Sequence, residues 1–431
     1  MNAIILTAFI IILFAFVISG LPLIAALAVG YILFAINAAL KGFSLKNIAD
    51  MSLDGIKTVK NILITFMLIG IMTALWRACG TIPVIVSLAS MIISPEIFVM
   101  LTFLLCCAIS FLTGTAFGTS ATMGVICMTM AKSLGIDPVI MGGAILGGSY
   151  FGDRCSPVST SALLVSELTK TDIYRNIKQM LKTAVVPFVI SCIIYLVFGF
   201  LNPPASMEML DVSAMFSSEF SLSLIAVLPA VLILILAFFK VNVKINMLAS
   251  SVFATIIAVF IQNLPISDIL TFSVVGFTAK NEALAPMING GGIVSMLNAA
   301  AIVCISSSYS GIFKETGLLE PVRKLIDRGR SRLSAFALTL ASSLLCASVA
   351  CNQTLTIMLT NELCSHTEEN KNKFAIYLEN SAVVVAPLIP WSIASGVSLS
   401  SVGAPSASIV FALFLYLLPI YSLFIFRNKH K

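Results

Sequence analysis

The chain has 431 residues, of which 59% are hydrophobic and only 10% are charged. Soluble globular domains carry about a quarter charged residues, so this composition excludes an ordinary soluble fold. The formal net charge of +6 does not indicate nucleic-acid binding, because the basic residues lie in short loops between apolar segments. Apolar runs of roughly 17–22 residues recur along the chain, and each can cross a hydrocarbon core of about 30 Å. The sequence therefore predicts an all-α, polytopic membrane protein.

The clear membrane spans are predicted in chain order at 3–19, 22–40, 61–77, 96–112, 183–201, 220–239, 246–262, 293–313, 333–350 and 405–426. The first span starts almost at Met1 and lacks a basic flank, so we expect a membrane helix and not a cleaved signal. Shorter or interrupted apolar stretches lie at 79–93, 119–131, 137–151 and 375–398. Their Gly, Pro, Ser and Thr content predicts broken or re-entrant helices, which need surrounding protein or a wet cavity.

Loop charge predicts the orientation of the chain. Basic residues dominate segments 41–60, 170–182 and 314–332 and the tail "RNKHK", which places these parts in the cytoplasm. Segment 202–219 carries three acids and no basic residue, so we expect it outside. Both termini are then cytoplasmic, and we expect the protein in the cell (inner) membrane.

The chain also repeats itself. Segments 30–56 and 250–276 share the order of a hydrophobic helix followed by an amphipathic stretch with an Asp. Loop charge puts the amphipathic stretch of the first unit inside and that of the second unit outside. We therefore expect two inverted-topology repeats, 1–201 and 220–431, joined by an extracytoplasmic linker at 202–219. In such transporters broken helices meet near the bilayer midplane, where the binding site lies.

Two pairs of polar segments interrupt spans at similar places in the two halves. The first pair is "FLTGTAFGTSATMG" (111–124) and "SVACNQTLTIML" (348–359); the second is "GGSYFGDRCSPVSTS" (147–161) and "YLENSAVVVAPLIPWSIASG" (377–396). A break frees backbone carbonyls, and these, with hydroxyls and one carboxylate, can cage a small cation. Such a carboxylate can exchange the cation for a proton. Asp153 is the first candidate and Glu379 the second.

Each candidate has a structural alternative. Asp153 and Arg154 can form a helix-end pair at the interface, and Glu379 can be a plain interfacial charge after the polar segment "HTEENKNK". The hydroxyls of "GTAFGTS" can serve close helix packing, and we prefer that interpretation for Ser306, Ser307 and Ser308. The ten cysteines form no CxxC pair, so neither a disulfide framework nor a resident metal or other cofactor is expected.

The motifs "GTAFGTSATMGV", "GGAILGGSYFGDRCSPVSTSALL", "TDIYRNIKQMLKT", "GIFKETGLLEPV" and "LENSAVVVAPLIPWS" resemble the NhaC family of Na⁺/H⁺ antiporters, in order over about 111–400. The resemblance implies an inner-membrane secondary antiporter that exports Na⁺ as H⁺ enters, and by analogy a homodimer. The polar motifs of the family match this chain at Asp153, Ser156, Thr115, Thr119, Glu379, Ser381 and Trp391.

The chain departs from the family pattern, which usually has Asp where this sequence has Asn352 and Asn380. An amide oxygen still ligates Na⁺, but an amide releases no proton. Both asparagines stay in the candidate cation site. The loss of two carboxylates leaves a second function open, the Na⁺- or H⁺-coupled transport or exchange of a small carboxylate (malate or lactate type) or an amino acid. Candidate solute contacts are then Arg154, Ser159, Ser381 and Trp391.

An enzyme and a channel are less favoured. "FGD" resembles part of a membrane aspartyl protease motif, but the chain has no Tyr-Asp motif to supply the paired acid. It also lacks HExxH and GxSxG. A channel is disfavoured because an inverted repeat argues for alternating access.

Overall fold

The computed structural model describes residues 2–19, 21–90, 94–157, 159–202, 212–239, 241–282, 284–316 and 333–427. Within these ranges the secondary structure is helical, apart from one isolated antiparallel bridge between Phe277 and Gly290. This agrees with the all-α class that the composition predicts.

The helices of the first half follow the apolar runs. They are α1 (Asn2–Ile18), α2 (Leu23–Leu40), α3 (Leu45–Thr58), α4 (Lys60–Ala78), α5 (Thr81–Ser90), α6 (Pro95–Thr113), α7 (Ala116–Thr119), α8 (Val125–Ser133), α9 (Pro138–Cys155), α10 (Thr160–Thr169) and α11 (Ile173–Leu201). A π-helical turn at Ser120–Gly124 joins α7 to α8.

The second half has more short helices. They are α12 (Val212–Ser217), α13 (Leu228–Phe238), α14 (Val243–Phe260), α15 (Ile266–Val275), α16 (Ala285–Ile288), α17 (Gly292–Ser295), α18 (Leu297–Thr316), α20 (Ala335–Ala350), α21 (Gln353–Cys364), α22 (Lys371–Glu379), α23 (Ala382–Val385), α24 (Ile393–Val402) and α25 (Leu413–Ile425).

Three described helices, α4, α6 and α11, are each long and apolar enough to cross a membrane alone. The segments Lys371–Leu388 and Ile393–Val402 pass the same test as a pair, with a bend of 55° at their break. Eight shorter apolar helices accompany them. The stretch 375–398 is therefore bent at this break. The stretch 137–151, in contrast, is not broken, because it belongs to the continuous helix α9, which runs on to Cys155.

α9 lies at the centre of the first half and packs against α6, α11 and α25. Glycines set the approach to α6: a Cβ at Gly152 would lie 2.0 Å from the carbonyl carbon of Ser110, and one at Gly148 2.7 Å from the carbonyl oxygen of Phe103. Any larger residue would push the two helices apart. The glycines of "GGSYFGD" thus bring the polar end of α9 into the protein interior.

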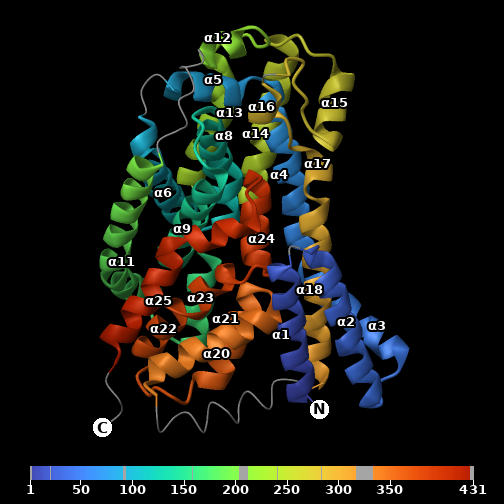
Figure 1. Cartoon of the computed structure of the whole chain (residues 1–431), viewed down its shortest axis with the longest axis vertical. Helices are drawn as coiled ribbons and strands as arrows, with labels where there is room; N and C mark the ends of the chain where they lie inside the picture. Colours follow the sequence, from blue (N-terminus) through green and yellow to red (C-terminus); the bar gives the residue numbers. More distant parts are fainter. Residues whose placement is uncertain are drawn as a thin grey trace.

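Figure 1 shows how the two halves are arranged along the long axis of the molecule. α3 lies near the lower end and α15 near the upper end. α2 of the first half packs against α18 of the second half, and α14 of the second half packs against α4 of the first. Segment 202–219 contains α12, and its residues 203–211 lie outside the described part of the chain.

Candidate cation-binding site

Two helix breaks have the same backbone form. Gly114, with φ 67°, is the C-cap of α6, and Thr115 then caps α7 in an extended conformation, its hydroxyl accepting from the N–H of Gly118 at 3.3 Å. Cys351, with φ 55°, is the C-cap of α20, and Asn352 caps α21 in the same way. Glycine enters the left-handed region at no steric cost, whereas Cys351 occupies it as a rare non-glycine residue. These breaks lie inside the segments 111–124 and 348–359 that the sequence singles out.

Asp153 lies on the last turn of α9, next to a third break. α9 ends at Cys155, and Ser159 caps α10. The side chain of Asp153 is buried, and its Oδ2 accepts from Ser161 Oγ at 2.9 Å and from Gln353 Nε2 at 3.0 Å. Its backbone carbonyl accepts from Ser161 Oγ at 2.7 Å and from Ser159 Oγ. The carboxylate is thus held by donors from both halves of the chain.

A cavity of about 210 Å³ opens where these breaks meet. The described residues that line it are Ile62, Thr115, Ala116, Phe117, Tyr150, Asp153, Thr160, Asn352, Gln353, Thr354, Ile393 and Ala394. Asp153 is the charged side chain of this lining, and the polar remainder is hydroxyl and amide. One carboxylate among oxygen donors suits a small hard cation and offers no positive group to an anion.

Arg154 faces away from Asp153. The guanidinium donates to the backbone carbonyl of Met180 at 3.2 Å, to the hydroxyl of Thr183 at 3.0 Å and to Oδ1 of Asn380. Successive helical residues point about 100° apart, so two neighbours in sequence can serve different sites. Arg154 is fully buried and lies outside the described lining of the cavity.

Glu379 and its neighbours gather around Arg154. Glu379 is fully buried, and neither of its carboxylate oxygens meets a hydrogen-bonding partner among the residues that the structure describes. Its burial is unlike that of an interfacial charge. Asn380 accepts from Arg154 and donates to Ser422 Oγ at 2.7 Å. These side chains form a second polar cluster beside the cavity.

The remaining candidate residues support the backbone of the breaks. Thr119 Oγ1 donates to the carbonyl of Thr115 at 2.9 Å, and Ser381 Oγ donates to that of Tyr377 at 2.7 Å. Trp391 is fully buried, and its Nε1 donates to the carbonyl of Ser348 at 2.8 Å. Ser156 is buried at the end of α9.

Sequence reasoning did not single out Gln353, Ser161 or Tyr150. Gln353 and Ser161 bond directly to Asp153, and Tyr150 lines the cavity with its hydroxyl on the carbonyl of Ala394 at 2.8 Å. Ser161 and Tyr150 belong to the segment "GGSYFGDRCSPVSTS", and Gln353 follows Asn352 in "SVACNQTLTIML". Their positions on the turns that flank a break are the signal that could have found them.

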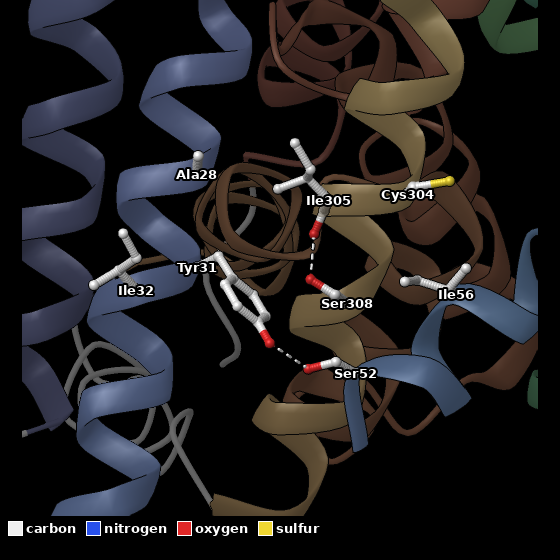
Figure 2. Close-up of a pocket in the computed structure, with 8 residues that line it drawn as sticks. All are labelled: Ala28, Tyr31, Ile32, Ser52, Ile56, Cys304, Ile305 and Ser308. Atoms are coloured by element: carbon white, nitrogen blue, oxygen red, sulfur yellow. Dashed lines mark hydrogen bonds between the residues drawn. The ribbon is translucent and has the colours of Figure 1, made fainter. Parts of the chain in front are cut away.

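A larger cavity of about 390 Å³ lies between α2, α3 and α18 (Figure 2). Its described lining consists of Ala28, Tyr31, Ile32, Ser52, Ile56, Cys304, Ile305 and Ser308, with no charged side chain among them. The hydroxyls of Tyr31 and Ser52 bond to each other at 3.1 Å, and Ser308 Oγ donates to the carbonyl of Ile305 at 2.6 Å. These hydroxyls are already paired, so the cavity is apolar and does not suit a cation.

The chain is similar to known transporters over most of its length. The model of the Na⁺/H⁺ antiporter family matches residues 1–168 and 148–426. The Na⁺/H⁺ antiporter NhaC of Alkalihalophilus pseudofirmus is 31% identical over 383 residues, which cover 85% of this chain and 82% of that protein.

Other relatives carry organic solutes. The malate-2H⁺/Na⁺-lactate antiporter of Bacillus subtilis is 26% identical over 86% of this chain and 82% of its own length. The arginine/ornithine antiporter ArcD of Halobacterium salinarum is 25% identical over 84% of this chain and 76% of its own length. The family match, the all-helical architecture and the oxygen-lined cavity agree with one another. This multi-pass membrane protein belongs to the Na⁺/H⁺ antiporter family.

Proposed function

We propose that this family member exports Na⁺ in exchange for H⁺, and that the two ions compete for the carboxylate of Asp153. The observation that carries the proposal is the position of Asp153 as the charged group in the described lining of a buried cavity. A carboxylate that binds one ion at a time exchanges them, because occupancy by either excludes the other.

The ligands that we assign to Na⁺ come from the three breaks. Asp153 supplies the charge, while Thr115 and Asn352 supply oxygen at the first turns of α7 and α21. Thr119 and Ser159 hold the backbone of these turns, and Ser156 is buried at the end of α9. The other candidate residues, Arg154, Glu379, Asn380, Ser381 and Trp391, are not assigned to the ligand shell, and among them Glu379 is the second candidate for proton binding.

The transport cycle that we propose is alternating access by two inverted repeats, 1–201 and 220–431. Several features support the repeat beyond the paired breaks. The spacing from the cap of α9 at Asp137 to that of α10 at Ser159 equals the spacing from Asn370 to Ser392, the caps of α22 and α24. In each segment a proline precedes the second cap by two residues.

The same register extends to the last helix of each half. Pro187 interrupts α11 and Pro419 interrupts α25, at nearly the same distance beyond the break. The contacts of α2 with α18 and of α14 with α4 are exchanged between the halves, and α3 and α15 lie at opposite ends of the molecule (Figure 1). This register sets Ala386 opposite Asp153.

The topology that goes with this proposal has both termini and segments 41–60, 170–182 and 314–332 in the cytoplasm, and 202–219 outside the inner membrane. Residues 317–332 and the tail from 428 lie outside the described part, so their side rests on charge alone. We also propose that this protein forms a homodimer, as its resemblance to the family implies by analogy.

Exchange of a small carboxylate or amino acid is the second candidate function, favoured by the names of two relatives. An organic anion requires a positive group at the site, yet Arg154 is engaged elsewhere and the described cavity lining carries only a negative charge. The geometry therefore supports Na⁺ as the principal cargo.

The experiment uses everted vesicles with an acidified lumen. Adding Na⁺ or Li⁺ should dissipate the pH gradient with the wild-type protein and not with Asp153→Asn. Asp137→Asn is the matched control, because Asp137 caps the N-terminus of α9 by accepting from the N–H of Val139, and this variant should transport normally. No response to Na⁺, Li⁺ or K⁺, together with uptake of labelled malate, lactate or an amino acid, would replace the proposal by the second candidate.

A further inference from the structure

The amide of Gln353 connects the cation site to the broken helix of the second half. Its Nε2 donates to Oδ2 of Asp153 at 3.0 Å and to the backbone carbonyl of Val383 at 3.0 Å. Gln353 begins α21, and Val383 lies in α23, just after α22 has ended at Glu379. A single nitrogen thus holds a carboxylate of one half and a backbone group of the other.

The carbonyl of Val383 depends on this outside donor. In a regular α-helix it would accept from the N–H of the residue four positions later, which is Pro387 and has no N–H. Gln353 supplies a replacement bond. Losing that bond leaves a buried carbonyl in need of a new partner, which favours a rearrangement of the segment around it.

A cation and an amide N–H cannot occupy the same place beside a carboxylate oxygen. The N–H carries partial positive charge and ligates no cation, whereas the amide oxygen does. Na⁺ that binds Oδ2 of Asp153 on the side where Gln353 now donates takes the place of Nε2 and displaces it. Because both bonds leave the same nitrogen, this displacement also disturbs the bond to Val383.

We propose that Gln353 is the positioning residue that couples cation occupancy of Asp153 to movement of the α22–α23 segment. In the empty site Gln353 joins Asp153 to Val383; when the cation arrives, Gln353 leaves both. The broken helix of the second half is then released only when the site is filled, as tight coupling requires. This inference rests on the proposed cation exchange at Asp153.

Ser161 offers a matched control. Its Oγ donates to the same Oδ2 of Asp153 at 2.9 Å, but its other contacts are the backbone carbonyl of Asp153 and the hydroxyl of Ser159, all in the first half. Ser161→Ala therefore perturbs the carboxylate without touching the link to Val383. Gln353→Met removes the donor while keeping a side chain of similar length.

The test compares wild type, Q353M and S161A in proteoliposomes, measuring protons moved per Na⁺ transported. Wild type and S161A should keep the same ratio, whereas in Q353M it should fall severalfold because Na⁺ crosses without the counter-movement of protons. Q353M should also bind Na⁺ about tenfold more tightly, since a charge-assisted hydrogen bond no longer competes. An unchanged ratio in Q353M, or an equal loss in S161A, overturns the proposal.

A second measurement covers a Q353M protein that does not transport. Hydrogen–deuterium exchange of residues 379–392 is compared in Na⁺ and in an impermeant organic cation, with Gln353→Asn as a shorter second variant. Wild type and S161A should change exchange on adding Na⁺, and the Gln353 variants should not. A Na⁺ response in these variants, or none in wild type, overturns the coupling role. Absence of Na⁺-driven proton movement in wild-type proteoliposomes would instead overturn the proposed function.

Discussion

Replacing Asn380 by Leu tests whether the Arg154 cluster stabilises the fold. Asn380 gives Arg154 one of its neutral acceptors and donates to Ser422 at 2.7 Å, and all three side chains are fully buried. A hydrogen bond to a charged group contributes about 2 kcal/mol and a neutral one about 1 kcal/mol, so N380L should lower the free energy of unfolding by about 3 kcal/mol. Ser422→Ala loses only the neutral bond and should cost about 1 kcal/mol.

The assay is denaturant unfolding of the purified protein in mixed micelles, followed by fluorescence. The chain has two tryptophans, Trp76 and Trp391, and both are fully buried, so exposure on unfolding should change their emission. Asn380→Asp keeps an acceptor for Arg154 and should remain folded. If N380L unfolds within about 0.5 kcal/mol of S422A, the Arg154–Asn380 bond contributes nothing measurable and the reasoning fails.

Three further changes can be checked with the same preparations. Gly152→Val should disrupt the contact of α9 with α6, because its Cβ would lie 2.0 Å from the carbonyl carbon of Ser110; we expect loss of folded protein, whereas Gly396→Ala, with open space around its Cβ, should fold normally. A normal yield of folded G152V would contradict the close approach. Cys351→Gly should keep or raise stability by up to about 1 kcal/mol because φ is 55°, and a marked loss would show that the thiol is needed there. The pKa of Glu368 is lowered overall. Burial raises this pKa, but two contacts outweigh it: Lys373 Nζ lies 3.0 Å from the carboxylate, and the N–H of Asn370 donates to it. A lowered carboxylate pKa contributes stability above the unfolded value of about 4.3 and loses it as pH falls further, so Lys373→Met should reduce the loss of stability below about pH 4 in the unfolding assay; an unchanged acid limb would show that the pair is not formed in solution.

Much of the helical framework was accessible from the sequence. Apolar length located most helices, and small and polar residues within spans located the breaks at Gly114–Thr115 and Cys351–Asn352. Boundaries were less accessible: α11 begins at Ile173, ten residues before the predicted span, because Asp172 caps it within the basic segment. Hydropathy indicates which part of a helix can lie in lipid, whereas the capping residue decides where the helix begins.

The candidate site could be foreseen only in part. Asp153 stood out because an acid in an apolar run demands an explanation. The separation of Asp153 from Arg154 and the contact of Asp153 with Gln353, 200 positions away, depend on how the halves pack. The burial of Glu379 was likewise obscured by the polar segment before it, since local composition does not reveal which tertiary neighbours cover a side chain.

The two breaks share a backbone form but differ chemically, with Thr115 at one and Asn352 at the other. Among the described residues that line the cavity, the charged one, Asp153, comes from the first half. An ion in this cavity therefore faces the hydroxyl of Thr115 at one break and the amide of Asn352 at the other. If the halves exchange roles during the cycle, the inward-open and outward-open states bind Na⁺ with different kinetics. Forward and reverse exchange must obey the same equilibrium, yet each direction can have its own Michaelis constant for Na⁺.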